Sequence, residues 1–107
     1  MIRVVEYVDG KGRSAYAAWF QTLDTVAGDR VVRAVYQLAR GNFSNVKGVG
    51  SGVLERRINF GPGYRIYFGR DGERVVILLG GGTKARQFED ISIAKGRWWD
   101  YRRSKPR

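Results

Sequence analysis

Hydrophobic and polar positions follow several different periods along the chain. Residues 2–8 are rich in β-branched and aromatic side chains and stop at Asp9-Gly10, which predicts a strand closed by a turn. Residues 12–23 carry large apolar side chains at spacings of three and four, which predicts a helix with one buried stripe. That stripe consists of Tyr16, Trp19, Phe20 and Leu23.

A second helical pattern follows directly. Asp24-Thr25 is suited to cap it, and the pattern runs to Arg40 before Gly41-Asn42 ends it. Its inward positions are Val31, Val35 and Leu38. Residues 41–52 are rich in Gly and Asn and predict a loop, which carries the single cation Lys47.

The period changes to two between residues 53 and 80. Runs at 53–60, 64–69 and 74–80 are separated by Gly61-Pro62-Gly63 and by residues 70–73, which predicts a three-strand antiparallel meander. We interpret Gly80-Gly81-Gly82 as a tight turn into the last helix; a phosphate-binding loop is the weaker interpretation because the Walker spacing is missing.

The last helix is predicted from about Lys84 to Arg103, with a basic tail beyond it. Its apolar stripe is Phe88, Ile91, Ala94, Trp98 and Tyr101, and Trp99 is the aromatic residue expected on the surface. The resulting order β-α-α-β-β-β-α predicts one α+β domain over residues 1–107, a mostly antiparallel sheet with helices on one face and an open second face.

Side-chain alternation indicates what each sheet face carries, since residues two apart in a strand share a face. The predicted core positions are Leu54, Ile58, Tyr64, Ile66 and Phe68. The open face then carries Glu55, Arg57, Asn59, Arg65 and Tyr67.

Composition and net charge limit the kinds of ligand and partner that we expect for this protein. The 107 residues are 43% hydrophobic, which is enough to fold, and 20 Lys and Arg against 10 Asp and Glu give a net charge of +10. The excess is concentrated in residues 51–107, which carry 13 basic and 6 acidic side chains. No Cys or His is present, so we expect no disulfide, no metal and no cofactor. No signal peptide or bilayer-length apolar run is apparent, which predicts a cytoplasmic protein.

The open face favours single-stranded nucleic acid, above all RNA, as the partner. Arg57, Arg65 and Tyr67 would be flanked by Lys47 and by Lys84 with Arg86, so cations can hold phosphates while an aromatic ring stacks on a base. The alternative is that these side chains are simply solvated, as charged residues on exposed sheet faces usually are.

Several segments together resemble the RelE/ParE superfamily of toxins from bacterial toxin–antitoxin modules, and in particular its HigB-like, phage-derived branch. The matching segments are residues 38–42, 46–50 and 54–58, Gly61-Pro62-Gly63-Tyr64-Arg65 with residues 66–68, residues 78–84, and Gln87 through Asp90-Ile91. The resemblance implies a RelE-like fold and a ribosome-dependent mRNA endoribonuclease that needs no metal and is held inactive by a helix-turn-helix, HigA-like antitoxin.

The resemblance also implies site residues. Arg65 matches the arginine used on the scissile phosphate, Lys84 a basic residue of the same site, and Asp90 a helix residue that closes it. Arg57 matches a cation of the preceding strand, within one position, and Arg56 and Gln87 join Lys47, Tyr67 and Arg86 as expected RNA contacts. The implied reaction is attack of a ribose 2′-OH on its own 3′-phosphate, which requires a base, cations and an acid. Lys84, Asp90 and Glu55 all remain possible as the base.

Two matters stay open at the level of sequence. Arg56 occupies an inward position where relatives commonly have leucine, so either the strand bulges or the side chain reaches the edge of the sheet. The same fold also serves ParE-like gyrase inhibitors, which act by protein contact, and an inactive relative that only binds its antitoxin is a third alternative.

Overall fold

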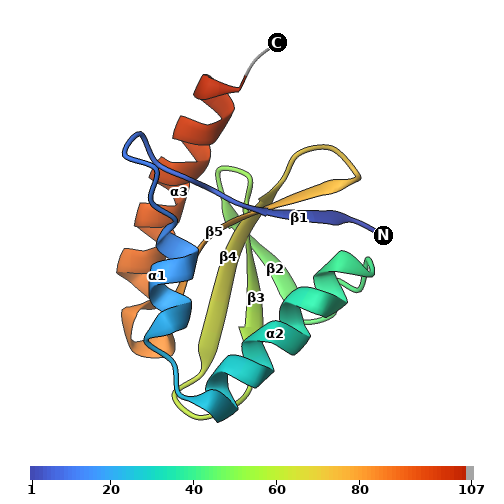
Figure 1. Cartoon of the computed structure of the whole chain (residues 1–107), viewed down its shortest axis with the longest axis vertical. Coiled ribbons are helices and arrows are strands. Elements are labelled where there is room, and N and C mark those ends of the chain that lie inside the picture. The colour runs from blue at the N-terminus through green and yellow to red at the C-terminus, as the bar shows by residue number, and fades with distance from the viewer. Residues whose placement is uncertain (106–107) are drawn as a thin grey trace.

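The computed structural model describes residues 1–105, in which five strands and three α-helices form an α+β fold (Figure 1). The elements are β1 (Arg3–Glu6), α1 (Ala15–Gln21), α2 (Thr25–Ala39), β2 (Val46–Gly50), β3 (Val53–Ile58), β4 (Tyr64–Arg70), β5 (Val75–Thr83) and α3 (Gln87–Ser104), with a 3₁₀ turn at Lys84–Arg86. The predicted basic tail extends into residues 106–107, which lie outside the described residues.

Side-chain caps set where the first two helices begin. Ser14 Oγ accepts a hydrogen bond from the backbone N–H of Ala17, so α1 begins later than residue 12. Asp24 Oδ1 accepts from the N–H of Ala27, which confirms the predicted cap of α2. None of the helices in residues 1–105 has both the length and the apolar character needed to cross a bilayer.

The sheet is mixed and has the strand order β1-β5-β4-β3-β2. β1 runs parallel to β5 and the other three pairings are antiparallel, so the mostly antiparallel prediction is confirmed. The predicted element order is wrong by one strand, because the expected loop contains β2. Glycine is favoured in that segment because the chain turns tightly at Gly50-Ser51-Gly52, where all three residues have positive φ. This turn lets β2 fold back onto β3.

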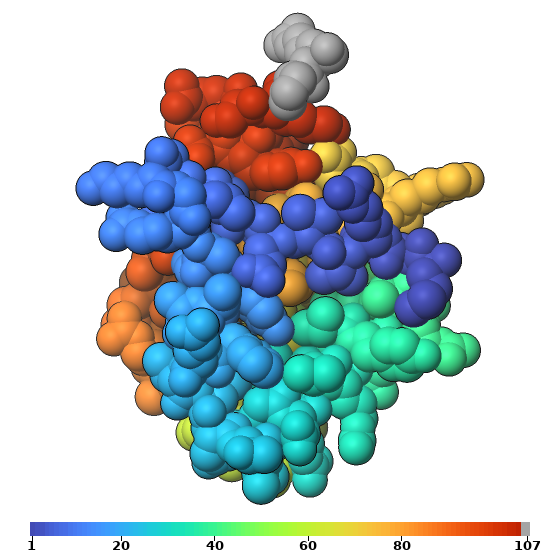
Figure 2. Space-filling model, viewed as in Figure 1, coloured from blue at the N-terminus to red at the C-terminus, as the bar shows by residue number. Residues whose placement is uncertain are grey.

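Helices cover both faces of the sheet, so the prediction of helices on one face is wrong. The core under α1 and α2 includes Ile66, Phe68, Val76 and Leu78 from the sheet, together with the predicted inward residues of both helices. The core under α3 includes Val53, Tyr67, Ile77 and Leu79. α1, α2 and the N-terminal residues make up most of the surface seen in Figure 2, where the first part of α3 lies partly behind α1 and its C-terminal end is in view above them. The physical reason is that β5 is apolar at five consecutive positions, so both of its sides require cover.

The Gly80-Gly81-Gly82 triplet lies inside β5 and is not the predicted turn. Each glycine admits a side chain from a helix: a Cβ would lie 2.8 Å from an Arg97 nitrogen at Gly80, 2.4 Å from the Trp19 ring at Gly81 and 1.9 Å from an Asp90 oxygen at Gly82. The three glycines therefore set how closely α1 and α3 approach the two faces of the sheet.

Candidate functional site

The turn Gly61-Pro62-Gly63 between β3 and β4 brings the three predicted catalytic cations together. Arg57 and Arg65 are register partners on adjacent strands. Arg65 Nη1 donates a hydrogen bond of 2.7 Å to the carbonyl oxygen of Gly63, and the backbone N–H of Lys84 donates to that of Pro62 at 3.4 Å. Gly63 has φ +79°, and a Cβ there would lie 3.1 Å from Arg65 Nη1, so glycine is required for this close approach.

A buried ion pair lies below this turn. Arg65 Nε is 3.6 Å from Glu55 Oε2, with 8% of the Arg65 side chain and none of the Glu55 side chain exposed. Gln87, the first residue of α3, donates from Nε2 to the same carboxylate oxygen at 2.8 Å. The pair therefore fixes both the arginine and the start of α3, while Glu55 Oε1 has no hydrogen-bond partner among the described residues.

Asp90 and Tyr67 lie beside this ion pair, between α3 and the sheet. Burial raises the pKa of Asp90, although the nearby Arg86 guanidinium, 3.8 Å away, opposes that change. Asp90 Oδ2 packs on Gly82 and has no hydrogen-bond partner within residues 1–105. Burial, followed by the charges of Glu55 and Asp90, raises the pKa of Tyr67, so its hydroxyl stays protonated at neutral pH.

The expected open sheet face is not open. Arg65 and Tyr67 do share a face, as alternation predicted, but α3 covers it and leaves Arg65 6% and Tyr67 1% exposed. Tyr67 packs in the core under α3 with Trp98, so its ring is not available to stack on a base. Alternation within a strand identifies which residues share a face, but it does not show whether a helix from a later part of the sequence covers that face.

The exposed cations form a rim around the buried pair. They are Arg57 on β3, Lys47 on β2 opposite Glu55, and Lys84 and Arg86 in the 3₁₀ turn. Phe88, which was predicted to be core, is 86% exposed in the first turn of α3. The spacing of the apolar stripe continues to Phe88, but in this first turn the residues that face the sheet are Gln87 and Asp90, which contact Glu55 and Gly82. We call Arg57, Lys47, Lys84, Arg86 and Phe88 the basic rim.

Arg56 is not part of this arrangement. Its side chain lies on the opposite face of the sheet, under α2, where Nη2 donates to Gln37 Oε1. The strand pairing through Arg56 is regular, so the bulge that the sequence left open does not occur. The partner that holds Arg56 is a polar residue on the inward side of α2, which the apolar pattern of that helix did not reveal.

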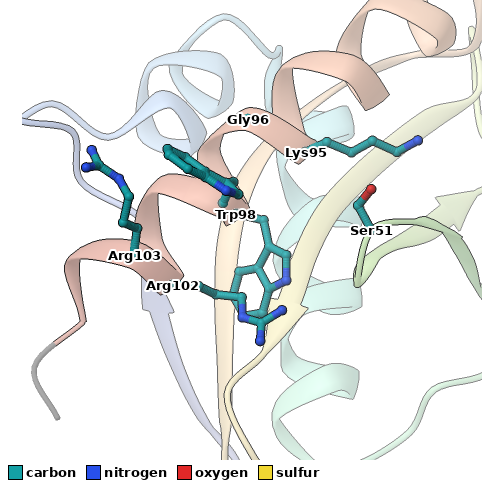
Figure 3. Close-up of a pocket in the computed structure, with 7 residues that line it drawn as sticks. Ser51, Lys95, Gly96, Trp98, Arg102 and Arg103 are labelled. Atoms are coloured by element: carbon teal, nitrogen blue, oxygen red, sulfur yellow. The ribbon is translucent and has the colours of Figure 1, made fainter.

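A pocket of about 550 Å³ lies toward the other end of α3 (Figure 3). It is lined by Lys95, Trp98, Trp99, Arg102 and Arg103 from α3 and by Ser51 from the β2–β3 turn. Trp99 is 64% exposed, as predicted, and the Arg103 guanidinium lies 4.8 Å from its ring centroid. This pocket contains no carboxylate, and it is separate from the ion pair of Glu55 and Arg65.

No group of three potential metal-binding side chains gathers anywhere in residues 1–105. The ionisable side chains at the turn are guanidinium, ammonium and carboxylate groups, which are able to hold phosphates, stabilise negative charge and transfer protons.

Comparison with known proteins finds a bacterial protein of similar sequence. No family model matches the sequence. An uncharacterized protein of Haemophilus influenzae is 37% identical over 81 residues, which cover 75% of this chain and 82% of that protein. At this identity and coverage, the chain belongs to the same family as the Haemophilus influenzae protein.

Proposed function

We propose that this chain has the RelE-like fold and is the toxin of a type II toxin–antitoxin module, a ribosome-dependent endoribonuclease that cuts mRNA. The observation that carries the proposal is the meeting of Arg57, Arg65 and Lys84 at one turn, beside the carboxylates of Glu55 and Asp90. The matching Gly-Pro-Gly-Tyr-Arg and Gly-Gly-Thr-Lys segments support the same assignment.

In the proposed reaction the ribose 2′-OH attacks the adjacent phosphorus, the bond to the 5′-oxygen of the next nucleotide breaks, and a 2′,3′-cyclic phosphate and a 5′-OH form. Arg57 and Lys84 are exposed and contact the phosphate directly. Arg65 is held from below by Gly63 and Glu55, so its positive charge is already in place when negative charge grows on the phosphorane.

Asp90 is the proposed proton acceptor. Its side chain is 15% exposed, although the oxygen without a hydrogen bond, Oδ2, is buried against Gly82, whereas Glu55 is fully buried and its Oε2 faces Arg65 and Gln87. A carboxyl whose pKa is raised by burial is a stronger base when ionised, which suits removal of the 2′-proton.

The basic rim is the proposed path of the RNA. Lys47 and Arg86 add phosphate contacts, Gln87 positions Glu55, and the exposed ring of Phe88 takes the base-stacking role that the buried Tyr67 cannot. The remaining proposed partner is a helix-turn-helix antitoxin, and the proposed compartment is the cytoplasm, where ribosomes and mRNA meet.

Cell-free translation followed by primer extension on the message tests the proposal. The wild-type protein should cut mRNA within codons, and Lys84→Ala and Asp90→Asn should each cut about 10²–10³-fold more slowly, because each removes a charge that acts in the transition state. Arg74→Ala removes an exposed cation from the β4–β5 turn and serves as the matched control with wild-type rate. Intact mRNA alongside inhibited gyrase supercoiling would instead identify the gyrase-inhibitor alternative.

A further inference from the structure

Arg56 is a buried cation without a counter-ion. It is 8% exposed, and its guanidinium donates to Gln37 Oε1 and to the carbonyl oxygen of Arg57, both neutral acceptors. Its Nε has no partner, and no carboxylate lies within ion-pair distance of it in the described part of the chain. Buried charges are normally paired, because removing a charge from water costs several kcal/mol unless an opposite charge offsets it.

The surroundings of Arg56 add more positive charge. It lies in a groove of about 190 Å³ between α2 and the end of β3. The groove is lined by Arg30, Arg33, Arg56 and Arg57, together with the amides of Gln37 and Asn45, and no carboxylate lines it. Arg30 and Arg33 are exposed and form no ion pair within residues 1–105. The guanidinium of Arg30 lies 4.3 Å from the ring centroid of Phe60, which positions it at the mouth.

The guanidinium groups of Arg30, Arg33 and Arg56 surround one small groove and repel one another, so an anion bound between them would lower the electrostatic free energy of the groove. Phosphoryl oxygens match it best, because guanidinium groups grip phosphate in pairs and amide N–H groups complete its hydrogen bonds. We propose that the groove formed by α2 and β3 around Arg56 is a phosphate-binding site.

This phosphate site is distinct from the proposed cleavage site. Arg56 points toward α2, whereas Arg65 and Glu55 lie on the face covered by α3. Only Arg57 borders both. The phosphoryl group belongs either to a small phosphate ester or to the backbone of a nucleic acid strand that continues past Arg57. Phosphate binding here does not require that the chain cut RNA.

A thermal titration with inorganic phosphate tests the site. Wild-type protein should be stabilised by phosphate in a saturable way beyond the effect of sodium chloride at equal ionic strength. Arg56→Leu and Arg33→Ala should each bind phosphate at least tenfold more weakly. Both variants should fold, since leucine removes a buried charge and Arg33 is exposed. Arg74→Leu, which removes a cation from the β4–β5 turn, should bind as the wild type does.

A competition experiment then separates the two sources of phosphate. A 2′-O-methyl oligonucleotide with a 5′-OH offers only phosphodiesters and is resistant to cleavage, and a nucleoside monophosphate offers a terminal phosphate. Tighter binding of the oligonucleotide that falls tenfold in Arg56→Leu assigns the groove to a nucleic acid backbone, and the reverse order assigns it to a small ester. Equal phosphate affinity in Arg56→Leu and wild type, or stabilisation that chloride reproduces in all proteins, would overturn the proposal.

Discussion

Replacing Gly81 by alanine tests why the glycines in β5 are there. A Cβ on Gly81 would lie 2.4 Å from two atoms of the Trp19 ring, and carbon atoms in contact are normally about 3.5–4.0 Å apart. The indole or the strand must therefore move by roughly 1 Å. Trp19 has little room to do so, because the Tyr16 and Tyr64 rings lie 6.0 and 6.5 Å from it between centroids.

The expected cost follows from two opposing effects. Overpacking of this kind destabilises a protein by about 1–3 kcal/mol, whereas the lower backbone entropy of alanine in a strand returns about 0.5–1 kcal/mol. Because an approach of 2.4 Å is a severe overlap, the overpacking term lies in the upper part of its range, at about 2–3 kcal/mol. We therefore expect a net loss of about 1–2.5 kcal/mol, which lowers the Tm by roughly 4–20 °C in a domain of this size. Circular dichroism melts and urea titrations of purified Gly81→Ala measure it.

Gly96→Ala is the matched control. Gly96 is an exposed glycine in α3, and a Cβ there would meet nothing within 4 Å. The same substitution should raise stability by about 1 kcal/mol, because alanine is the better helix former. If Gly81→Ala melts at or above the wild-type temperature, the close approach of Trp19 does not explain the glycine and the reasoning is refuted.

Three further predictions concern single carboxylates. Asp24→Ala removes the cap of α2, a hydrogen bond of 2.8 Å, and should cost about 1 kcal/mol in urea titrations with an unchanged m-value; no loss would show that the cap is dispensable. Glu55→Gln leaves the buried Arg65 cation unpaired and should lower the free energy of unfolding by about 3–5 kcal/mol. The double variant Glu55→Gln, Arg65→Gln should be destabilised by less than the sum of the two single variants, and additive losses would contradict a direct pairing. Hydrogen bonding from Lys105 lowers the pKa of Asp71 in the folded protein. The ionised Asp71 carboxylate therefore contributes its full stabilisation of the fold above about pH 4, and this contribution is lost as the pH falls through the lowered pKa. Urea midpoints of Asp71→Asn should therefore decline less than wild type on acidification, and parallel curves would argue against this pair.

Much of the secondary structure could be predicted from the sequence, because it depends on interactions between neighbouring residues. Asp24 caps α2 through a bond to its own neighbouring backbone, and the spacing of Val31 and Leu38 describes one face of the same helix. The alternation of Tyr64, Ile66 and Phe68 likewise separates the two faces of β4. These features depend on residues a few positions apart, so periodicity and capping chemistry are sufficient to find them.

The errors share a cause, which is contact between distant segments. Covering the face of Arg65 and Tyr67 requires α3, which starts about 20 residues later. A sequence signal for this cover exists: residues 75–79 are all apolar, and a strand buried on both faces shows such a run. β2 carried no comparable signal, because its two glycines, Gly48 and Gly50, disfavour a strand in isolation and are accommodated through its pairing with β3.

The candidate site divides in the same way. Sequence pattern and resemblance identified Arg57, Arg65 and Lys84, and the structure brings them to the Gly61-Pro62-Gly63 turn. Alternation already placed Arg56 on the side of β3 opposite to Arg57, but the burial of Arg65 against Glu55 and the contact of Arg56 with Gln37 follow only from the packing of α3 and α2 on opposite faces of the sheet. Side-chain direction is a local property of a strand, whereas burial and charge pairing depend on which element covers each face.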